Sequence, residues 1–126
     1  MKNNLHSVPL AQSYLLLNHG PVTLVTSAPA GQANVMAAAW AMPLDFDPAK
    51  VLLVIDKQTL MREFVDATGE FALNIPGRDL ADKVLAAGSV SGREGDKFAR
   101  TGLETFAATQ IAAPLISDCL DWLECR

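Results

Sequence analysis

The sequence lacks the features that would assign it to several large classes of protein. Its ten Lys and Arg residues are scattered and the net charge is −4, so there is no basic stripe for nucleic acid or an anionic membrane surface. No apolar run approaches the roughly 20 residues that span a bilayer. The amino terminus, MKNNLHSVPLAQ, lacks the apolar core of a signal peptide. These absences predict a cytoplasmic protein that binds neither nucleic acid nor membrane.

Familiar catalytic and metal-binding motifs are absent as well. The patterns GxSxG, HExxH and GxGxxG and the Walker loop do not occur, and His6 and His19 are far apart in the sequence. Cys119 and Cys125 have neither CxxC spacing nor a neighbouring His, so we expect two ordinary thiols and no metal site. Hydrolysis through an activated nucleophile therefore has little support.

The composition is typical of one compact domain. Half of the 126 residues are apolar, 19% are charged, and the mean hydropathy is +0.20. The chain has no internal repeat, low-complexity tract or linker. We therefore predict a single domain over residues 1–126.

The first half of the chain predicts strands joined by turns. The β-branched residues of 22–27 predict a half-buried strand, and residues 28–32 have the composition of a turn. Residues 33–40 are then the returning strand of a hairpin. Two prolines bracket a predicted loop at 44–47, and the continuous apolar run 51–55 predicts a strand buried on both faces.

The second half predicts short helices between strands. Thr59 and Asp96 stand at N-cap positions, and Gly69 and Gly102 stand where helices terminate. The predicted elements are helix 60–68, strand 70–75, helix 79–87, helix 97–100 and strand 120–125. Hairpins with helices set between them indicate an α+β fold, an antiparallel barrel or sandwich with helical insertions.

Two predicted helix starts carry groups that bind anions. Lys57-Gln58-Thr59 opens the first helix, where free backbone N–H groups, the helix dipole, a hydroxyl and an ammonium would meet one phosphate. Lys97 begins a short helix, where a cation does not stabilise the helix, so a ligand is one explanation. A solvated Lys beside a Thr cap, and a surface Lys97, are the alternatives.

The stretch GQANVMAAAW, residues 31–40, combines small side chains with a terminal Trp40. A strand of alanines leaves its backbone uncovered, so a flat ligand would be able to approach it closely. Alternatively, the small residues allow another helix or strand to pack tightly there. Trp40 is then a core or dimer-interface residue.

Four segments together resemble a known family. GPVTLVTS, ANVMAAAWAMPLDFDP, the pair Gly69-Glu70-Phe71 and Asn74-Ile75-Pro76, and SGREGDKFARTGLE occur in the order found in the flavin reductase-like family of the FMN-binding split barrel, flavoredoxins included. The resemblance covers about residues 18–126. It implies a mostly β fold with short helices (α+β), an antiparallel Greek-key split barrel, and a homodimer that holds one FMN per subunit near the dimer interface. It also implies an FMN-dependent oxidoreductase, in which electrons pass from NAD(P)H or another carrier through FMN to an acceptor.

The resemblance also assigns cofactor-binding residues, but no catalytic residue and no metal ligand. Thr59 and the turn before it are expected at the FMN phosphate or ribityl chain, and Trp40 beside the flavin. Lys97 either neutralises the phosphate or faces the electron-poor edge of the flavin ring. Ala39 stands where the family often has Ser, which removes one polar contact. The full set is Asn34, Val35, Met36, Ala37, Ala39, Trp40, Asp56, Lys57, Thr59 and Lys97.

The chain departs from the family pattern at its end. Members of the family continue past residues 120–126 with further strands, which include a His and an aromatic residue near the flavin. We therefore expect a barrel truncated at its carboxyl end: either the protein is shortened, or the sequence lacks its carboxyl portion, or a partner chain completes the barrel. A dimer is one way to cover the free strand edge. The alternatives to an FMN-dependent oxidoreductase are a non-catalytic flavin-binding or structural dimer, and an electron carrier that has no nicotinamide site. No motif distinguishes NADH from NADPH or identifies the acceptor.

Overall fold

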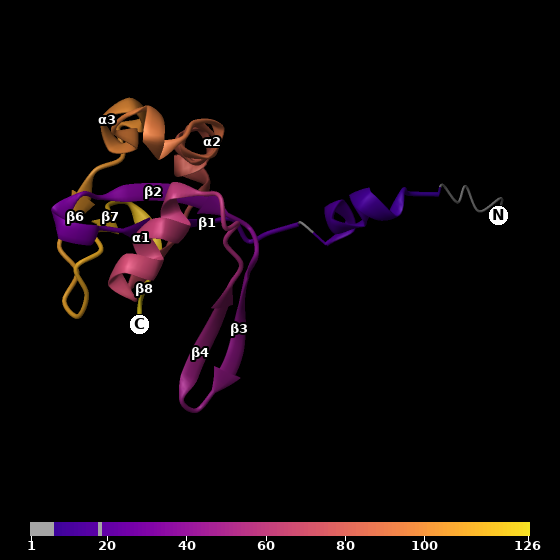
Figure 1. Ribbon diagram of the computed structural model, residues 1–126, viewed down its shortest axis with the longest axis horizontal. Helices are drawn as coiled ribbons and strands as arrows, with labels where there is room; N and C mark the ends of the chain where they lie inside the picture. Colours follow the sequence, from indigo (N-terminus) through magenta and orange to yellow (C-terminus); the bar gives the residue numbers. More distant parts are fainter. Residues whose placement is uncertain (1–6, 18) are drawn as a thin grey trace.

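The computed structural model describes residues 7–17 and 19–126 (Figure 1). Its main sheet has four antiparallel strands in the order β2-β1-β5-β8. These strands are β1 (Thr23–Ser27), β2 (Asn34–Ala38), β5 (Phe71–Pro76) and β8 (Cys119–Cys125). Two smaller antiparallel pairs are β3 (Ala41–Phe46) with β4 (Ala49–Leu53), and β6 (Thr105–Phe106) with β7 (Leu115–Ile116).

Three α-helices cover the main sheet from both sides. They are α1 (Leu60–Thr68), α2 (Ala81–Ser89) and α3 (Lys97–Thr101), and short 3₁₀ helices lie at Leu10–Leu16, Pro29–Gly31, Arg78–Leu80 and Gly92–Glu94. Leu24 of β1 packs in one cluster with residues of α2 and α3, whereas its neighbour Val25 packs in another with Met61 of α1. Successive strand residues point to opposite faces, so α1 lies on the face opposite α2 and α3.

The helix boundaries predicted from capping residues are confirmed. The Thr59 side chain accepts a hydrogen bond from the backbone N–H of Arg62, and α1 ends at Gly69 with φ 66°. The Asp96 side chain accepts two backbone N–H bonds at the start of α3, which ends at Gly102. Strands β5 and β8 also lie within one residue of the predicted ranges.

The burial of β1 was underestimated by the sequence prediction. All five of its residues are buried, including the polar residues Thr23, Thr26 and Ser27. The hydroxyl of Thr23 donates to the Ala38 carbonyl at 2.9 Å, and that of Thr26 donates to the Pro114 carbonyl at 2.6 Å. These bonds satisfy the polar atoms, so an alternating pattern is compatible with a strand covered on both faces.

The predicted loop at 44–47 is wrong, because most of it is strand. β3 continues to Phe46, and the turn to β4 is made at residues 47–48. The strand pairing shifts register between Pro43 and Asp45, which accommodates a residue that cannot donate to the ladder. Pro43 therefore marks an irregular strand, whereas Pro48 lies in the turn of the hairpin.

The prediction of a doubly buried strand at 51–55 is also wrong. β4 ends at Leu53, and Leu52 is 43% exposed. Figure 1 shows β3 and β4 extending together away from the main sheet. Within residues 7–17 and 19–126, no layer covers the end of the hairpin, and its apolar residues Leu44 and Phe46 are exposed.

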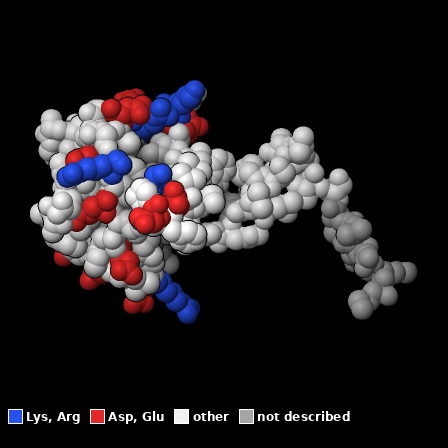
Figure 2. All heavy atoms as spheres, turned by 90° about the horizontal axis from the view of Figure 1, so that it is seen from below, with Lys and Arg blue, Asp and Glu red and all other residues white. Residues whose placement is uncertain are grey.

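The surface shows no concentration of positive charge on the face drawn in Figure 2, where basic and acidic side chains are interspersed. Residues 7–17 form an uncharged arm beside the body. Within the described ranges, no helix has the length and apolar character needed to cross a bilayer.

Asn74 ties three strands together through its buried amide. Its Nδ2 donates to the Leu24 carbonyl at 2.8 Å and to Thr26 Oγ1 at 3.3 Å, both in β1. Its Oδ1 accepts from the backbone N–H of Ile116 in β7 at 2.8 Å. The side chain is 0% exposed, so water cannot replace these bonds.

We predict that Asn74→Ala lowers the free energy of unfolding by about 2–4 kcal/mol, because it leaves buried donors and acceptors of two other strands unpaired. Urea unfolding monitored by tryptophan fluorescence measures this. Gln32→Ala, which removes an exposed amide, is the control and should change stability by less than about 0.5 kcal/mol. Equal effects of the two substitutions would contradict the role of Asn74.

Candidate functional site

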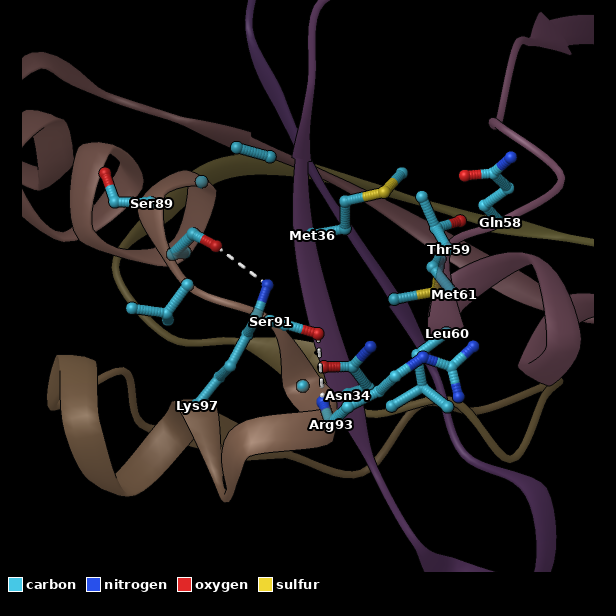
Figure 3. A pocket seen from close by; sticks show the side chains of 15 residues that line it. Asn34, Met36, Gln58, Thr59, Leu60, Met61, Ser89, Ser91, Arg93 and Lys97 are labelled. Carbon is cyan, nitrogen blue, oxygen red and sulfur yellow. Dashed lines mark hydrogen bonds between the residues drawn. The ribbon is translucent and has the colours of Figure 1, made fainter.

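A cavity of about 420 Å³ opens beside β2, between the start of α1, the end of α2 and the loop that leads to α3 (Figure 3). Lys97 reaches into it from one side and Thr59 and Met61 lie on the other, with Met36 of β2 between them. Its lining residues are Asn34, Met36, Ala37, Gln58, Thr59, Leu60, Met61, Ala87, Gly88, Ser89, Val90, Ser91, Gly92, Arg93 and Lys97.

The cavity depends on two close approaches to β2, one by the end of α2 and one by the loop that follows it. A Cβ added at Gly88 would lie 3.3 Å from the Ala37 Cβ, and one added at Gly92 would lie 2.5 Å from Asn34 Oδ1. The small residues of β2 therefore allow tight packing of α2, as one of the two interpretations of the alanine stretch predicted. Because Met36 and Ala37 also line the cavity, the two interpretations are compatible.

Thr59 and the turn before it form the α1 wall. The Thr59 hydroxyl donates to the Asp56 carbonyl at 2.8 Å and accepts from the Arg62 N–H at 3.2 Å. Asp56 Oδ1 accepts from the Gln58 N–H at 2.8 Å, so this carboxylate shapes the turn and does not line the cavity. The Thr59 hydroxyl thus caps the helix, and the start of α1 presents the positive end of the helix dipole to the cavity.

Lys97 is buried, so the alternative of a surface lysine is wrong. Its side chain is 6% exposed, and Nζ donates to the Ala87 carbonyl near the end of α2 at 2.8 Å. Burial lowers the pKa of the Lys97 ammonium from its usual value. An ammonium has three donors and strongly favours an anionic neighbour when it is desolvated.

Arg93 is a second cation at the cavity, and the sequence analysis did not select it. It lies in the 3₁₀ turn before α3, and its guanidinium forms an ion pair with Glu63 of α1. The hydrogen bond that Arg93 donates to Glu63, together with the negative charge of Glu63, raises the pKa of Arg93. The sequence did contain a signal for this residue, an Arg between the glycines of SGREGDKF. Its partner Glu63, however, lies 30 positions away in the sequence, so the contact could not be read locally.

The charge of the cavity is therefore of one sign. Arg93 and Lys97 line it, none of the described lining residues is Asp or Glu, and Glu63 lies outside the lining as the partner of Arg93. This contrasts with a chain whose net charge is −4. Two cations beside the start of a helix favour an anionic ligand.

The structure brings together half of the residues predicted from the sequence. Asn34, Met36, Ala37, Thr59 and Lys97 line the cavity, whereas Val35, Ala39, Trp40, Asp56 and Lys57 do not. Val35 is fully buried in the core, and Asp56 and Lys57 are exposed on the turn before α1. The flavin-binding roles of all ten residues stay predictions.

Trp40 lies at a separate hollow, beyond the end of β2. Its ring contacts that of Tyr14 edge to face, with centroids 6.0 Å apart, and it is 49% exposed. Ala39 lines the same hollow of about 390 Å³. Within this chain, therefore, Trp40 does not share a cavity with Thr59 and Lys97.

Both cysteines are free, as predicted. Burial, with a smaller effect of the Asp118 charge, raises the pKa of Cys119 to about 11, and burial also raises the pKa of Cys125. Both thiols are therefore protonated at neutral pH and poorly nucleophilic. Residues 7–17 and 19–126 contain no group of three His, Cys, Asp or Glu placed to hold a metal ion, and His6 lies outside these ranges.

The sequence model of the flavin reductase like domain matches residues 16–126. The chain belongs to this family. Its relatives include the uncharacterized protein YddH of Escherichia coli (strain K12), which is 42% identical over 122 residues, a match that covers 94% of this chain and 65% of YddH. This flavin reductase-like chain thus spans about two thirds of the length of that relative.

Solved structures of the family share the fold. An FMN-binding domain of a flavin reductases-like enzyme from Shewanella baltica OS155 is 38% identical with a TM-score of 0.81, covering all of this chain and 66% of that one. A flavoredoxin from Methanosarcina acetivorans is 32% identical with a TM-score of 0.78, covering 85% of this chain and 56% of that one. The predicted fold class, α+β with the antiparallel split barrel of this family, is confirmed.

We predict that Gly92→Ala destabilises the protein by about 1–3 kcal/mol, because the added methyl overlaps the Asn34 side chain and must displace it or the loop. Thermal unfolding measures the change. Gly77→Ala is the control, since its methyl would make an ordinary contact with the Leu120 side chain at 3.4 Å. A Gly92→Ala protein as stable as the control would show that the contact is easily relieved.

Proposed function

We propose that this chain binds FMN in the cavity beside β2 and acts as an FMN-dependent oxidoreductase. Electrons would pass from NAD(P)H, or from another carrier, through the flavin to an acceptor. The observation that carries the proposal is a cavity lined by two cations and by no carboxylate among the described residues, in a protein of net negative charge.

The lining chemistry fits the two parts of FMN. The phosphate suits Lys97, Arg93 and the start of α1, which offer positive charge and helix-end N–H groups. The flat ring suits the apolar side chains of Met36 and Met61. A volume of about 420 Å³ lies within the usual range of ligand pockets, roughly 300–1,000 Å³.

Bound FMN would supply the electron-transfer chemistry, and the protein would bind and orient it. Lys97 would serve in one of two ways, by neutralising the phosphate or by stabilising negative charge at the flavin ring. Neither role needs a catalytic triad, which agrees with the absence of nucleophile motifs in the sequence.

Relatives support the cofactor more directly than they support the reaction. The Shewanella protein is described as FMN-binding at 38% identity, and the Methanosarcina protein as a flavoredoxin at 32%. The chain covers 66% and 56% of those two proteins, so the nicotinamide donor, the acceptor and the predicted cytoplasmic location remain proposals.

We predict that Lys97→Ala weakens FMN binding by about tenfold while changing riboflavin binding by less than about twofold, because only FMN carries the phosphate. Quenching of flavin fluorescence measures both dissociation constants. Lys83→Ala is the matched control, since Lys83 Nζ also donates to a carbonyl, that of Gly102 at 2.7 Å, but lies outside the cavity. Equal losses for FMN and riboflavin would instead place Lys97 at the flavin ring.

Turnover separates an oxidoreductase from a flavin-binding protein without activity. We expect the purified protein to oxidise NADH or NADPH only when FMN is added, as measured by absorbance at the nicotinamide band. FMN binding without nicotinamide oxidation would favour the electron carrier or the non-catalytic dimer.

We also propose that the protein is a homodimer in which the β3–β4 hairpin contributes to the interface. Several large apolar side chains of this region are exposed, among them Phe46 at 97%. They are Met42, Leu44, Phe46, Leu52 and Val54. An apolar surface of this kind is typical of a protein interface.

We predict that Phe46→Asp shifts the protein from dimer to monomer, because a charge cannot be buried unpaired in an apolar interface. Light scattering after size-exclusion chromatography gives the mass. Leu85→Asp is the control, since Leu85 is 71% exposed on α2, away from the hairpin. A mass that stays dimeric in Phe46→Asp would remove the hairpin from the interface.

A further inference from the structure

The ion pair between Arg93 and Glu63 joins two walls of the cavity. Nη1 and Nη2 of Arg93 donate to the two carboxylate oxygens of Glu63, Nη1 to Oε2 at 3.4 Å. Glu63 belongs to the first turn of α1, and Arg93 belongs to the loop before α3. The pair therefore fixes the position of a long side chain that would otherwise be free to rotate.

Stability does not account for this pair. The two side chains are 49% and 56% exposed, and exposed ion pairs contribute little to folding because water and salt screen them. Two hydrogen bonds to one carboxylate do, however, restrict the plane of a guanidinium. The arrangement is thus better suited to orienting Arg93 than to holding the fold together.

Arg93 keeps donors for a further partner. A guanidinium has five N–H groups, and the pair with Glu63 uses one on each of two nitrogens. Arg93 lines both the 420 Å³ cavity and an adjoining hollow of about 550 Å³, which also share Asn34 and Gly92. Arg93 therefore borders the site where Lys97 supplies the other positive charge.

The loop that carries Arg93 is held in place independently of the ion pair. The backbone N–H of Arg93 donates to Ser91 Oγ at 3.2 Å, and the preceding Gly92 packs against the Asn34 side chain. The backbone position is thus set by β2 and the loop, while the side-chain direction is set by Glu63.

We propose that Arg93 binds the phosphate of the flavin nucleotide together with Lys97, and that Glu63 is the positioning residue that aims Arg93 at it. This inference rests on the proposed binding of FMN in the cavity. Glu63 adds negative charge near the phosphate and offsets the charge of Arg93, so the proposal requires that the lost orientation of Arg93 outweighs the removed negative charge. Removing Glu63 therefore weakens binding through loss of orientation.

The test compares dissociation constants for FMN and riboflavin in wild type, Arg93→Gln, Glu63→Gln and the double variant. We expect FMN binding to weaken about tenfold in Arg93→Gln, the effect of a lost charge-assisted hydrogen bond, and about threefold in Glu63→Gln. Riboflavin binding should change less than about twofold in each. Glu63→Gln should have no further effect in the Arg93→Gln background, because the two residues act as one unit.

Asp66→Asn is the matched control for charge. Asp66 also lies on α1, forms an exposed ion pair with Arg62 at 2.8 Å, and does not border the cavity. The substitution Asp66→Asn removes one negative charge from α1, as Glu63→Gln does, but it leaves Arg93 in place. FMN binding should therefore change by less than about twofold. Arg93→Lys keeps the positive charge but not the planar guanidinium, so its FMN affinity should fall several-fold. This variant replaces Arg93→Gln in the test if Arg93→Gln folds poorly.

Other outcomes overturn the inference in distinguishable ways. If wild type prefers FMN to riboflavin and the Arg93 and Glu63 variants keep that preference, the inference fails while the proposed function stands. If Glu63→Gln tightens FMN binding, Glu63 competes with the phosphate and does not position Arg93. If wild type binds neither flavin, the proposed function fails and the inference fails with it.

Discussion

The site depends on the absence of side-chain bulk where α2 and the following loop cross β2. Gly88 lies against Ala37, where an added methyl group would fit only tightly. Gly92 lies against Asn34, where an added methyl group would overlap the side chain. This packing brings the end of α2 and the loop next to the start of α1. Without it, Lys97 and Arg93 would not lie at the same cavity as Thr59.

Polar groups placed inside the fold keep that packing in register. Asn74 connects β5 to β1 and β7 with hydrogen bonds that water cannot reach. Strand β1 carries buried hydroxyls that bond to distant backbone carbonyls. Such groups penalise any slip of one strand past another, since a slip would leave them unpaired.

The sequence predicted the elements whose signals are local. Thr59 and Asp96 marked helix starts correctly, because a cap acts on backbone groups two or three residues away. The hairpin at 41–53 was misread because its prolines and its apolar run have different meanings in a projecting strand pair and in a buried sheet. Nothing local in the sequence records whether another layer covers a strand.

The site was predicted in part for the same reason. Thr59 and Lys97 were found because they stand at helix starts, and both line the cavity. Arg93 was missed because its significance comes from Glu63, 30 residues away, and Val35 was included although the core encloses it completely. Contacts between distant segments decide such cases, and a family resemblance supplies only the positions that its motifs contain.

Lys97 also changes the sign of the charge that the α2 side presents to the cavity. The amino end of α1 is positive and the carboxyl end of α2 is negative, and both ends border the same space. By donating to the Ala87 carbonyl, the ammonium offsets the negative end of α2. The α1 side of the cavity therefore favours an anion through the helix dipole, and the α2 side favours one through the Lys97 ammonium.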